Sequence, residues 1–518
     1  MPSDSIWLPF DGVPITVSIP MKHTSVVGRH QQKPSSSRVT DVRVTGAAVF
    51  LLPVKLRIPL KFGGQIVEEV TCARVAAEVR TAQGARAVGW GETPLSVQWG
   101  WPSSLPHAAR HDAMVRLTAA CAEAICEWPG SGHAMEIGHA FEVARLDELA
   151  RIATGDMSEA IPRLAALICL SPLDLAIHDA FGKVHGIDTF TSYTAEYLSR
   201  DLAELFADSG MLPDDADRGL FTGRYPADFL VAKPATELLA WHLVGGLDPL
   251  EASDLTGQEP DDGYPLLLAD WIRRDGLTCL KIKLRGDDID WDIARLLRVG
   301  GIGLVHGVTM FCADFNCTVS EPAYVHEVLD AIAAREPKLA RQLLYVEQPF
   351  PYDLAANPID VHSLGRRTRL FLDESAHDWR HVATGRALGW NGVALKTCKT
   401  MSGALLSLAW ARAHAMDIMV QDLTNPMLAM LPHAQLAAHA GTLAGVETNA
   451  SQFYPAASIS EATVHPGIYR RRNGMIDLRS LTGPGFGMRV EEMPRVLPEP
   501  FLTTGSLAAG GWLTLPGI

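Results

Sequence analysis

The sequence predicts an α/β fold in which a closed barrel of eight parallel strands, a (β/α)8 barrel, follows a smaller α+β domain. Three observations lead to this prediction. Eight short runs of strand-forming residues recur between residues 238 and 449. Most of the intervals between these runs have the apolar spacing of helices. The part of the chain before them changes once from strand-like to helix-like sequence, which is typical of an α+β domain.

The α+β domain is expected at residues 41–186, after an N-terminal extension, residues 1–40, with the polar run RHQQKPSSSR. Two runs rich in strand formers, TGAAVFLLPVKLRIPL and VTCARVAAEVRT, are joined by the turn-like segment KFGGQ and followed by GARAVGWGE. Helical patterns come next, in HAARHDAMVRLTAACAEAICEW, LDELARIA and SPLDLAIHDAFGKVHG. In the last of these, Leu173, Ile177 and Phe181 share one face, as the buried side of a helix requires.

Residues 187–234 interrupt this rhythm with acidic sequence that contains Pro and Gly, and we interpret them as an inserted lobe or a long connection. The barrel is expected at residues 235–470, and residues 471–518 as a C-terminal segment that returns to the α+β domain. Its eight strand-like runs are LLAWHLVGG, TCLKIKL, GVTMFCADFN, LLYVEQP, RLFLDES, GVALKTCK, DIMVQDLT and AGVETNA. An open, doubly wound sheet is the alternative, but eight repeats at this spacing favour closure.

Composition and charge exclude several classes of protein. The 518 residues carry 45 Lys and Arg against 59 Asp and Glu, a net charge of −14, which argues against non-specific nucleic-acid binding. The most apolar stretch, GAAVFLLPVKLRIPL, is interrupted by Lys55 and two prolines before it could cross a bilayer, and no secretory signal is visible. The eight cysteines are dispersed, as free thiols are in a reducing compartment. We therefore expect a cytoplasmic protein with no membrane and no nucleic-acid partner.

Acidic side chains follow three successive strands of the predicted barrel. Asp314, Glu347 and Asp373 each stand at the end of a strand-like run. Barrel enzymes place their catalytic side chains at these carboxyl ends, where the three carboxylates would meet and repel one another unless a cation neutralised them. Oxygen ligands of this kind suit Mg²⁺ or Mn²⁺. The sequence thus predicts a divalent-cation site, the alternative being three unrelated strand-end caps.

Lysines occupy the strand ends on either side of these carboxylates. Lys281 and Lys283 end the strand before them, and Lys396 and Lys399 end the strand after them. Charge scattered at random over a surface would not gather at the ends of hydrophobic runs. The pattern therefore indicates one site, with carboxylates between flanking lysines.

This order of residues resembles the enolase superfamily and, within it, the muconate-lactonizing-enzyme-like subgroup of the mandelate racemase/muconate lactonizing enzyme family. The barrel motifs that carry the resemblance are Lys-Ile-Lys at 281–283, Asp-Phe-Asn at 314–316, Glu-Gln-Pro at 347–349, Asp-Glu-Ser at 373–375 and the strand that ends at Lys396. Outside the barrel, GWGE, LDLAIHDAFGK and GPGFG also match landmarks of the family. The resemblance implies an enolase-type barrel and an N-terminal capping domain.

For the catalytic residues, the resemblance implies that Lys283 is the base on one face of the substrate, with Lys281 beside it. Lys396 would stand on the opposite face. The metal ligands would be Asp314, Glu347 and Asp373.

Further residues receive supporting roles from the same resemblance. Asn316 would support the metal site from behind the ligands or bind a metal-linked water. Glu374 competes with Asp373 as the third ligand, because other subgroups use Glu there, and Asp373 is favoured. Lys399 is expected to face away from the site, in a structural or solvent-exposed role.

Clues to the substrate are fewer. Asp422 ends the seventh strand, and Glu447 and Asn449 end the eighth, so that each is a candidate substrate contact. Dipeptide epimerases of this family usually have Asp-x-Asp on the eighth strand, so Glu447 and Asn449 argue against a dipeptide. KFGGQ at 61–65 and the region Trp99–Trp101 match the segments that close over the substrate in the family, surface turns being the alternative.

The residue types suit proton abstraction next to a carboxylate. Removal of that proton gives an enediolate with two negative charges, which a divalent cation stabilises. A lysine base must be neutral, and the nearby charges of Lys281 and the metal would lower the pKa of Lys283 from its usual value of about 10.4. Lysines on both faces permit racemisation or epimerisation, whereas one base and one cation permit elimination, dehydration or cycloisomerisation. We expect a Mg²⁺-dependent isomerase or lyase, by family analogy a homo-oligomer; the alternative is a catalytically silent barrel that acts as a binding or scaffold protein.

Overall fold

The computed structural model describes residues 6–10, 13–17, 38–208 and 215–515. The chain divides into two compact units, Met1–Ser36 and Ser37–Ile518. Within the first unit, β1 (Ile6–Phe10) and β2 (Val13–Val17) form an antiparallel hairpin that the sequence analysis did not predict. The rest of the expected N-terminal extension lies almost wholly outside the described residues.

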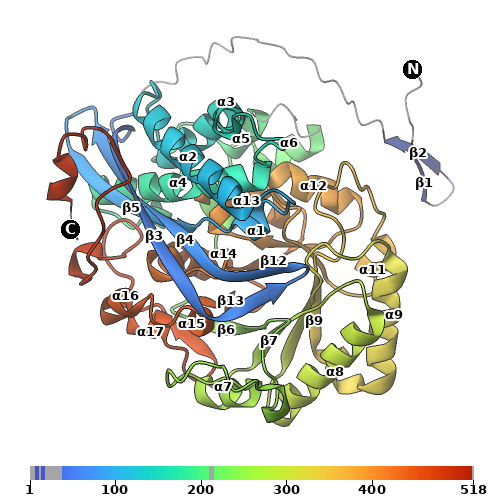
Figure 1. The fold of residues 1–518 in the computed structure, drawn as a ribbon. Coiled ribbons are helices and arrows are strands. Elements are labelled where there is room, and N and C mark those ends of the chain that lie inside the picture. Colours follow the sequence, from blue (N-terminus) through green and yellow to red (C-terminus); the bar gives the residue numbers. More distant parts are fainter. Residues whose placement is uncertain (1–5, 11–12, 18–37, 209–214, 516–518) are drawn as a thin grey trace. The chain divides into compact units, whose positions relative to one another are not determined.

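A four-stranded antiparallel sheet begins the second unit (Figure 1). In spatial order, its strands are β15 (Leu502–Gly505), β3 (Val42–Phe62), β4 (Gln65–Thr81) and β5 (Arg86–Pro94). The predicted KFGGQ turn joins β3 to β4, and Gly63 has the positive φ of 48° that such a tight connection demands. The far end of this hairpin packs against the barrel, where Leu60 and Val70 share an apolar cluster with Leu243.

Helices cover this sheet. They are α1 (Val97–Gly100), α2 (His107–Cys126), α3 (Ala134–Thr154) and α4 (Arg163–His185). Helix α4 lies directly on β5, and a Cβ atom at Gly89 would come within 2.1 Å of the Ala180 backbone. Among the described residues α4 is the one helix long and apolar enough to cross a membrane, and its apolar window is fully buried, as in the core helix of a folded domain.

A connection of short helices joins this domain to the barrel. Its elements are the 3₁₀ turn η1 (Thr189–Ser192), α5 (Leu202–Ala207), α6 (Asp215–Phe221) and the 3₁₀ turn η2 (Pro226–Phe229). Phe206 and Phe221 are buried in contact with one another, and Phe206 also packs on Trp379 of the barrel. The segment is thus a packed connection that contributes to the core.

Eight parallel strands form the barrel, as predicted. They are β6 (Glu237–Val244), β7 (Cys279–Lys283), β8 (Met310–Asp314), β9 (Leu343–Glu347), β10 (Leu370–Leu372), β11 (Gly392–Leu395), β12 (Asp417–Val420) and β13 (Val446–Glu447). The last strand pairs with the first, Val446 opposite Ala240 and Glu447 opposite Trp241. This pairing closes the sheet and excludes the open, doubly wound alternative.

Helices and short 3₁₀ turns follow the barrel strands (Figure 1). They are η3 (Ala252–Asp254), α7 (Leu268–Asp275), α8 (Ile289–Val305), α9 (Pro322–Arg335), α10 (Pro337–Gln342), α11 (His362–Gly365), α12 (Trp379–Ala387), η4 (Thr397–Lys399), α13 (Met401–Ala413), η5 (Met427–Ala429), α14 (Met430–Ala440), α15 (Ala450–Phe453), α16 (Ile459–Val464) and α17 (Pro466–Tyr469). The short strand β14 (Met475–Asp477) then pairs antiparallel with the first three residues of β6. Two 3₁₀ turns, η6 (Val490–Glu492) and η7 (Gly511–Thr514), flank β15.

The interior of the barrel is layered. Below the carboxyl ends of the strands, one buried cluster fills the interior. It consists of Trp241, Cys279, Cys312, Tyr345, Phe371 and Met419. Since side chains alternate along a strand, the residues two positions further on face the same interior. That next layer, at the carboxyl ends of the strands, is charged.

Candidate active site

Strand alternation and register bring the predicted site residues to one end of the barrel. Cys279, Lys281 and Lys283 point inward from β7, because they alternate with the outward-facing Leu280 and Ile282. Across the sheet Lys283 lies opposite Asp314 of β8, and Asp314 lies opposite Glu347 of β9.

Lys281 stands at the centre of this layer. Its Nζ lies 2.6 Å from Glu347 Oε1, 3.0 Å from Asp314 Oδ2 and 2.7 Å from Glu447 Oε1. Burial alone would lower the pKa of this lysine, but the three carboxylates outweigh burial and hold the pKa well above its usual value. Lys281 is therefore a fixed positive charge beside Lys283.

Lys283 lies on the β7 side of the site. Its Nζ is 2.5 Å from Asp314 Oδ2, and its position above the Phe62 ring, 5.8 Å from the centroid, brings it under the capping domain. The side chain is 8% exposed, so it reaches the surface of a pocket without facing bulk solvent.

Lys396 lies on the opposite side, directly after β11. Its Nζ is 3.0 Å from Asp373 Oδ2 and donates a hydrogen bond to the backbone oxygen of Asp422. The Trp99 ring lies 4.9 Å from the ammonium, a distance at which a cation–π contact forms. Burial would lower the pKa of Lys396, but the Asp373 carboxylate outweighs burial and the net pKa is raised.

Lys399 was expected to face away from the site, and that expectation is wrong. Its Nζ donates to the backbone oxygen of Asp373 at 2.5 Å and lies 3.5 Å from Asp373 Oδ1, with the residue 3% exposed. The cause is local: residues 397–399 form the 3₁₀ turn η4, and in a 3₁₀ turn side chains three positions apart lie on the same side. Lys399 therefore follows Lys396 toward Asp373, and burial lowers the pKa of Lys399.

The three predicted ligands differ in their electrostatic state. Burial alone would raise the pKa of Asp314, but Lys281 and Lys283 outweigh burial and bring the pKa well below its usual range. The pKa of Asp373 is also lowered, against the effect of burial, by the neighbouring lysines. Burial and the Asp314 charge raise the pKa of Glu347 well above normal.

The oxygen atoms at this end of the barrel fit a hard divalent cation in their chemistry. Within the described residues no three His, Cys, Asp or Glu side chains already surround one point, because the carboxylates turn to lysines instead. Two further oxygens beside them, Asn316 Oδ1 and Glu374 Oε2, are buried and have no hydrogen-bond partner among the described residues. The Asn316 amide donates to Glu374 Oε1 at 2.9 Å, so the two side chains form one group. Unpartnered buried oxygens next to three carboxylates match the ligand preference of Mg²⁺ or Mn²⁺.

The candidate substrate contacts on the last two strands also meet. The Asn449 amide donates to Asp422 Oδ1 at 2.8 Å and to Glu447 Oε2 at 3.4 Å. Burial raises the pKa of both carboxyl groups. These three side chains line the same pocket as Lys281, Lys283 and Lys396.

Sequence reasoning missed two glutamines. Gln421, the residue before Asp422, donates to Glu347 Oε2 at 2.6 Å. Gln348 accepts hydrogen bonds from the backbone N–H groups of Asp373 and Ser375, with a positive φ of 32°. The signal for Gln421 was its place at a strand end; Gln348 stood inside the Glu-Gln-Pro motif and was passed over because it is uncharged.

The pocket above the charged layer is small, with a cavity volume of about 50 Å³. Its roof comes from the capping domain, through Leu60, Phe62, Val67 and Val70, and Trp99 forms a side wall. Of the two interpretations of these segments, closure over the site fits the structure better than a surface turn. The Trp99 indole also donates to Glu374 Oε1 at 3.0 Å, which links the capping domain to the carboxylate group.

Comparison with known proteins identifies the barrel. Residues 266–493 match the sequence model of the family described as enolase C-terminal domain-like. Among solved structures, a dipeptide epimerase from Methylococcus capsulatus complexed with Mg and a dipeptide has a TM-score of 0.56 and 16% identity, over 86% of this chain and 99% of that one. A comparison with curated protein sequences finds no match.

Two further solved structures have the same architecture. A muconate lactonizing enzyme from Mycobacterium smegmatis has a TM-score of 0.53 and 15% identity, over 86% of this chain and 96% of that one. An N-succinyl Arg/Lys racemase from Bacillus cereus has a TM-score of 0.54 and 14% identity, over 86% and 95%. The barrel that the sequence predicts is confirmed, and the resemblance to the enolase superfamily is confirmed for residues 266–493. The solved structures named above are those of enzymes.

Proposed function

We propose that this chain, whose residues 266–493 belong to the enolase C-terminal domain-like family, is a Mg²⁺-dependent isomerase or lyase that removes the α-proton of a small carboxylate substrate. One observation carries the proposal. Two buried lysines, Lys283 on the second barrel strand and Lys396 after the sixth, face one pocket from opposite sides, with carboxylates between them.

The lysines carry the proton transfer in this proposal. Lys283 must leave its ion pair with Asp314 and lose its proton before it can accept one from the substrate, because an ammonium group is no base. Lys281, whose pKa the surrounding carboxylates hold high, stays charged beside it. Lys396 either returns a proton on the other face, which gives racemisation or epimerisation, or stays a cation, which gives elimination or cycloisomerisation.

The divalent cation would be held by Asp314, Glu347 and Asp373, with Asn316 and Glu374 alongside. When bound, it would offset the second negative charge that proton removal places on the substrate carboxylate. The choice of Asp373 over Glu374 as the third ligand is part of the proposal.

The pocket also favours a kind of substrate. Its floor is charged, while Leu60, Phe62, Val67 and Val70 make its roof apolar. Glu447 and Asp422 already have partners in Lys281 and Asn449, so they do not demand a cationic substrate group. We infer a small carboxylate whose remaining part is apolar or uncharged.

A scaffold function is less compatible with the interior. Burying charged groups costs several kcal/mol each unless they are paired, and replacing such pairs by apolar side chains is often stabilising. Three buried lysines around one pocket, Lys281, Lys283 and Lys396, with Lys399 buried against Asp373, therefore destabilise a barrel that performs no chemistry.

The test is solvent exchange with a library of small carboxylates. The protein is incubated with Mg²⁺ in D₂O, and α-deuteration is followed by NMR. At least one library member is expected to exchange, and Lys283→Ala should slow that exchange by about 10²-fold or more. The matched control is Lys338→Ala, an exposed lysine on α10. The proposal fails if no carboxylate exchanges, or if both variants exchange at the wild-type rate.

A further inference from the structure

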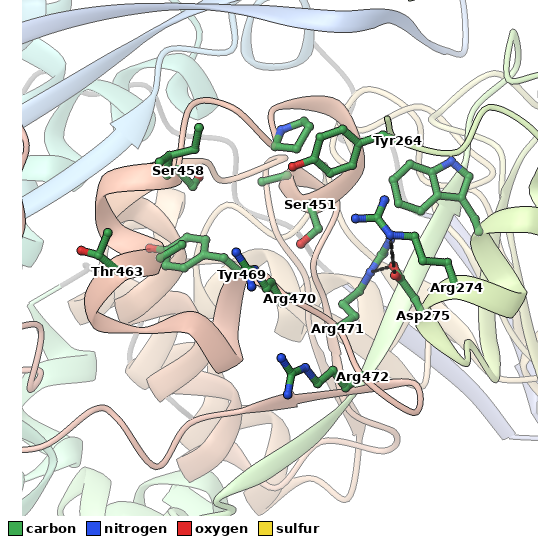
Figure 2. A pocket seen from close by; sticks show the side chains of 15 residues that line it. Tyr264, Arg274, Asp275, Ser451, Ser458, Thr463, Tyr469, Arg470, Arg471 and Arg472 are labelled. Carbon is green, nitrogen blue, oxygen red and sulfur yellow. Dashed lines mark hydrogen bonds and ion pairs between the residues drawn. The ribbon is translucent and has the colours of Figure 1, made fainter. Parts of the chain in front are cut away.

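A second cavity, of about 430 Å³, lies outside the lysine and carboxylate site. It is bordered by α7 on one side and by α15, α16 and the segment after α17 on the other. In Figure 2, Tyr264, Arg274 and Asp275 lie on one side of this cavity and Ser458, Thr463 and Tyr469 on the other. No residue that lines it also lines the pocket of the lysines. The proposed reaction leaves this cavity without a role.

Arginine side chains dominate the lining. Arg470, Arg471 and Arg472 are consecutive, and Arg274 joins them from α7. Asp275 is the one acidic residue in the lining, so four positive charges meet one negative charge and leave a net charge of +3. Among the described residues, Arg470 and Arg472 form no ion pair, while Arg274 lies 3.8 Å from Asp275.

Arg471 is the buried member of this arginine group. Its side chain is fully buried and forms an ion pair with Asp275, at 2.7 and 2.8 Å from Oδ2. Its Nη1 is buried and has no hydrogen-bond partner within the described part of the chain. A guanidinium is a five-donor fork, and a buried donor that is left unpaired costs free energy. Because the Arg471 side chain has no exposed surface, an acceptor brought by a ligand would satisfy this donor once the side chain turns toward the cavity.

The rest of the lining suits an organic molecule. Ser451 offers a hydroxyl group, while Ala462 and Ile459 are apolar. The hydroxyl groups of Thr463 and Tyr469 donate to backbone oxygens. The volume falls in the range of small-molecule sites and exceeds what a bare inorganic ion needs. Arg274 stacks over Tyr264, 4.7 Å from the ring centroid, which fixes one wall of the cavity.

We propose that this cavity binds a small organic phosphate. Four arginines and one aspartate line the cavity, so a bound anion meets an excess of positive charge. A phosphate monoester carries close to two negative charges on one compact group and accepts the paired hydrogen bonds of a guanidinium fork, which suits this lining better than a single carboxylate or a spread-out polycarboxylate. The unpaired charges of Arg470 and Arg472 and the free donor of Arg471 would receive its oxygens, and the remaining cavity holds its organic part.

The short helix α15 separates the two sites. Asn449 and Tyr454, on either side of it, line the lysine pocket, whereas Ala450 and Ser451 line the arginine cavity. Substitutions that test the proposal are therefore placed on Arg470 and Arg472, which are exposed and stand apart from α15.

Isothermal titration calorimetry of the full chain tests the proposal, with glucose 6-phosphate, inorganic phosphate and citrate as separate probes. Glucose 6-phosphate is expected to bind the wild type more tightly than either other probe. The double variant R470Q/R472Q should bind it at least about tenfold more weakly. The control R479Q, an exposed arginine paired with Glu237 outside the cavity, should match the wild type.

Two further variants keep the test specific. Lys283→Ala should retain the binding, which separates this cavity from the lysine pocket. R471K, which keeps the charge and loses the fork, should weaken it. The proposal is overturned if no phosphate probe binds, if citrate binds best, or if R470Q/R472Q binds like the wild type while its circular dichroism shows a native fold.

Discussion

At the scale of single residues, Lys281 is the charge on which the interior of the site depends. It touches Asp314, Glu347 and Glu447, all buried. The sequence placed it beside the base, but its central position follows from the register of β7 with the neighbouring strands. A single buried cation thus balances several carboxylates in the described structure.

Removing this charge should be costly. In Lys281→Met the carboxylates lose their common partner, and losing one member of a buried ion pair typically costs about 3–5 kcal/mol. We expect a loss of that size in the free energy of unfolding, measured by urea denaturation in EDTA, and a smaller loss with Mg²⁺ present. The exposed variant Lys338→Met serves as control. Equal unfolding free energies for Lys281→Met and wild type in EDTA would show that Lys281 does not hold these carboxylates.

The residue types at the strand ends were enough to predict most of the charged layer, but the position of Lys399 depends on the local backbone conformation. Lys399 was misplaced because a strand continued past Lys396 would alternate it away, whereas the 3₁₀ turn η4 brings it back to Asp373. Gln421 was overlooked because a neutral side chain gives no signal of charge at a strand end, although it contacts Glu347. Local backbone conformation of this kind is set by tertiary packing.

At the scale of elements, the family motifs outside the barrel form hydrogen bonds that hold separate segments of the chain together. Asp174 of α4 accepts hydrogen bonds from the backbone N–H groups of Met401 and Ser402, at the N-terminus of barrel helix α13. Asp179, also on α4, accepts from the N–H of Phe486 in the GPGFG motif. The Asp174 contacts fix the capping domain to the barrel, and the Asp179 contact fixes α4 to the C-terminal segment.

The glycines of GWGE have a steric purpose that can be tested. A Cβ at Gly89 would lie 2.1 Å from the Ala180 nitrogen and 2.2 Å from the Ala176 oxygen, both backbone atoms that cannot move aside. Gly89→Ala should therefore destabilise the protein by about 3 kcal/mol in urea unfolding, the upper part of the usual range for overpacking. Gly64→Ala is the control, since nothing lies within 4 Å of its Cβ. A stability change below that of the control would refute close packing of α4 on β5.

A buried histidine on α14 predicts a pH dependence. Burial lowers the pKa of His433 to about 4, and its Nε2 lies 2.9 Å from the Glu447 backbone oxygen. In the unfolded chain the pKa of His433 is near 6.5. Between pH 6.5 and 4 the histidine is therefore protonated in the unfolded chain and neutral in the folded protein. The contribution of His433 to the free energy of unfolding is therefore fully present above pH 6.5 and falls as the pH drops through this window.

The expected effect can be isolated by substitution. Between pH 6.5 and 5, wild type should lose about 2 kcal/mol of unfolding free energy through His433, a loss absent in His433→Gln. Urea unfolding of both proteins at the two pH values measures it. Parallel pH profiles for the two proteins would mean that His433 is not held neutral by burial.

At the scale of the whole molecule, the sequence was sufficient for the barrel and its family but not for every part. Eight strand signals and their charged ends are local patterns, so they could be read directly. The arginine cavity could not be predicted, because Arg274 and residues 470–472 are far apart in the sequence. They come together in the folded chain, where β14 pairs with β6. The helical connection at 187–234 had no clear periodicity, and its helices are short and held by packing on Trp379.

Binding of a divalent cation should also be measurable in the stability of the whole molecule. A ligand that binds the folded state alone raises stability by RT ln(1 + [L]/Kd), about 2.7 kcal/mol at a hundredfold excess over Kd. Mg²⁺ should thus raise the melting temperature of wild type. Asp314→Asn should lose most of this shift, measured against its own melting temperature in EDTA. An equal Mg²⁺ shift in both proteins would remove Asp314 from the ligand set.

The central claim is that two lysines act on opposite faces of one substrate. The direct measurement is α-proton exchange in D₂O for a carboxylate identified by the library. NMR monitors the exchange separately for each enantiomer of the substrate or for each half-reaction. Lys283→Ala should abolish exchange of the proton on its own face, and Lys396→Ala should affect only the opposite face or the later step. Wild-type exchange rates in Lys283→Ala, or an identical loss on both faces in both variants, would contradict the account.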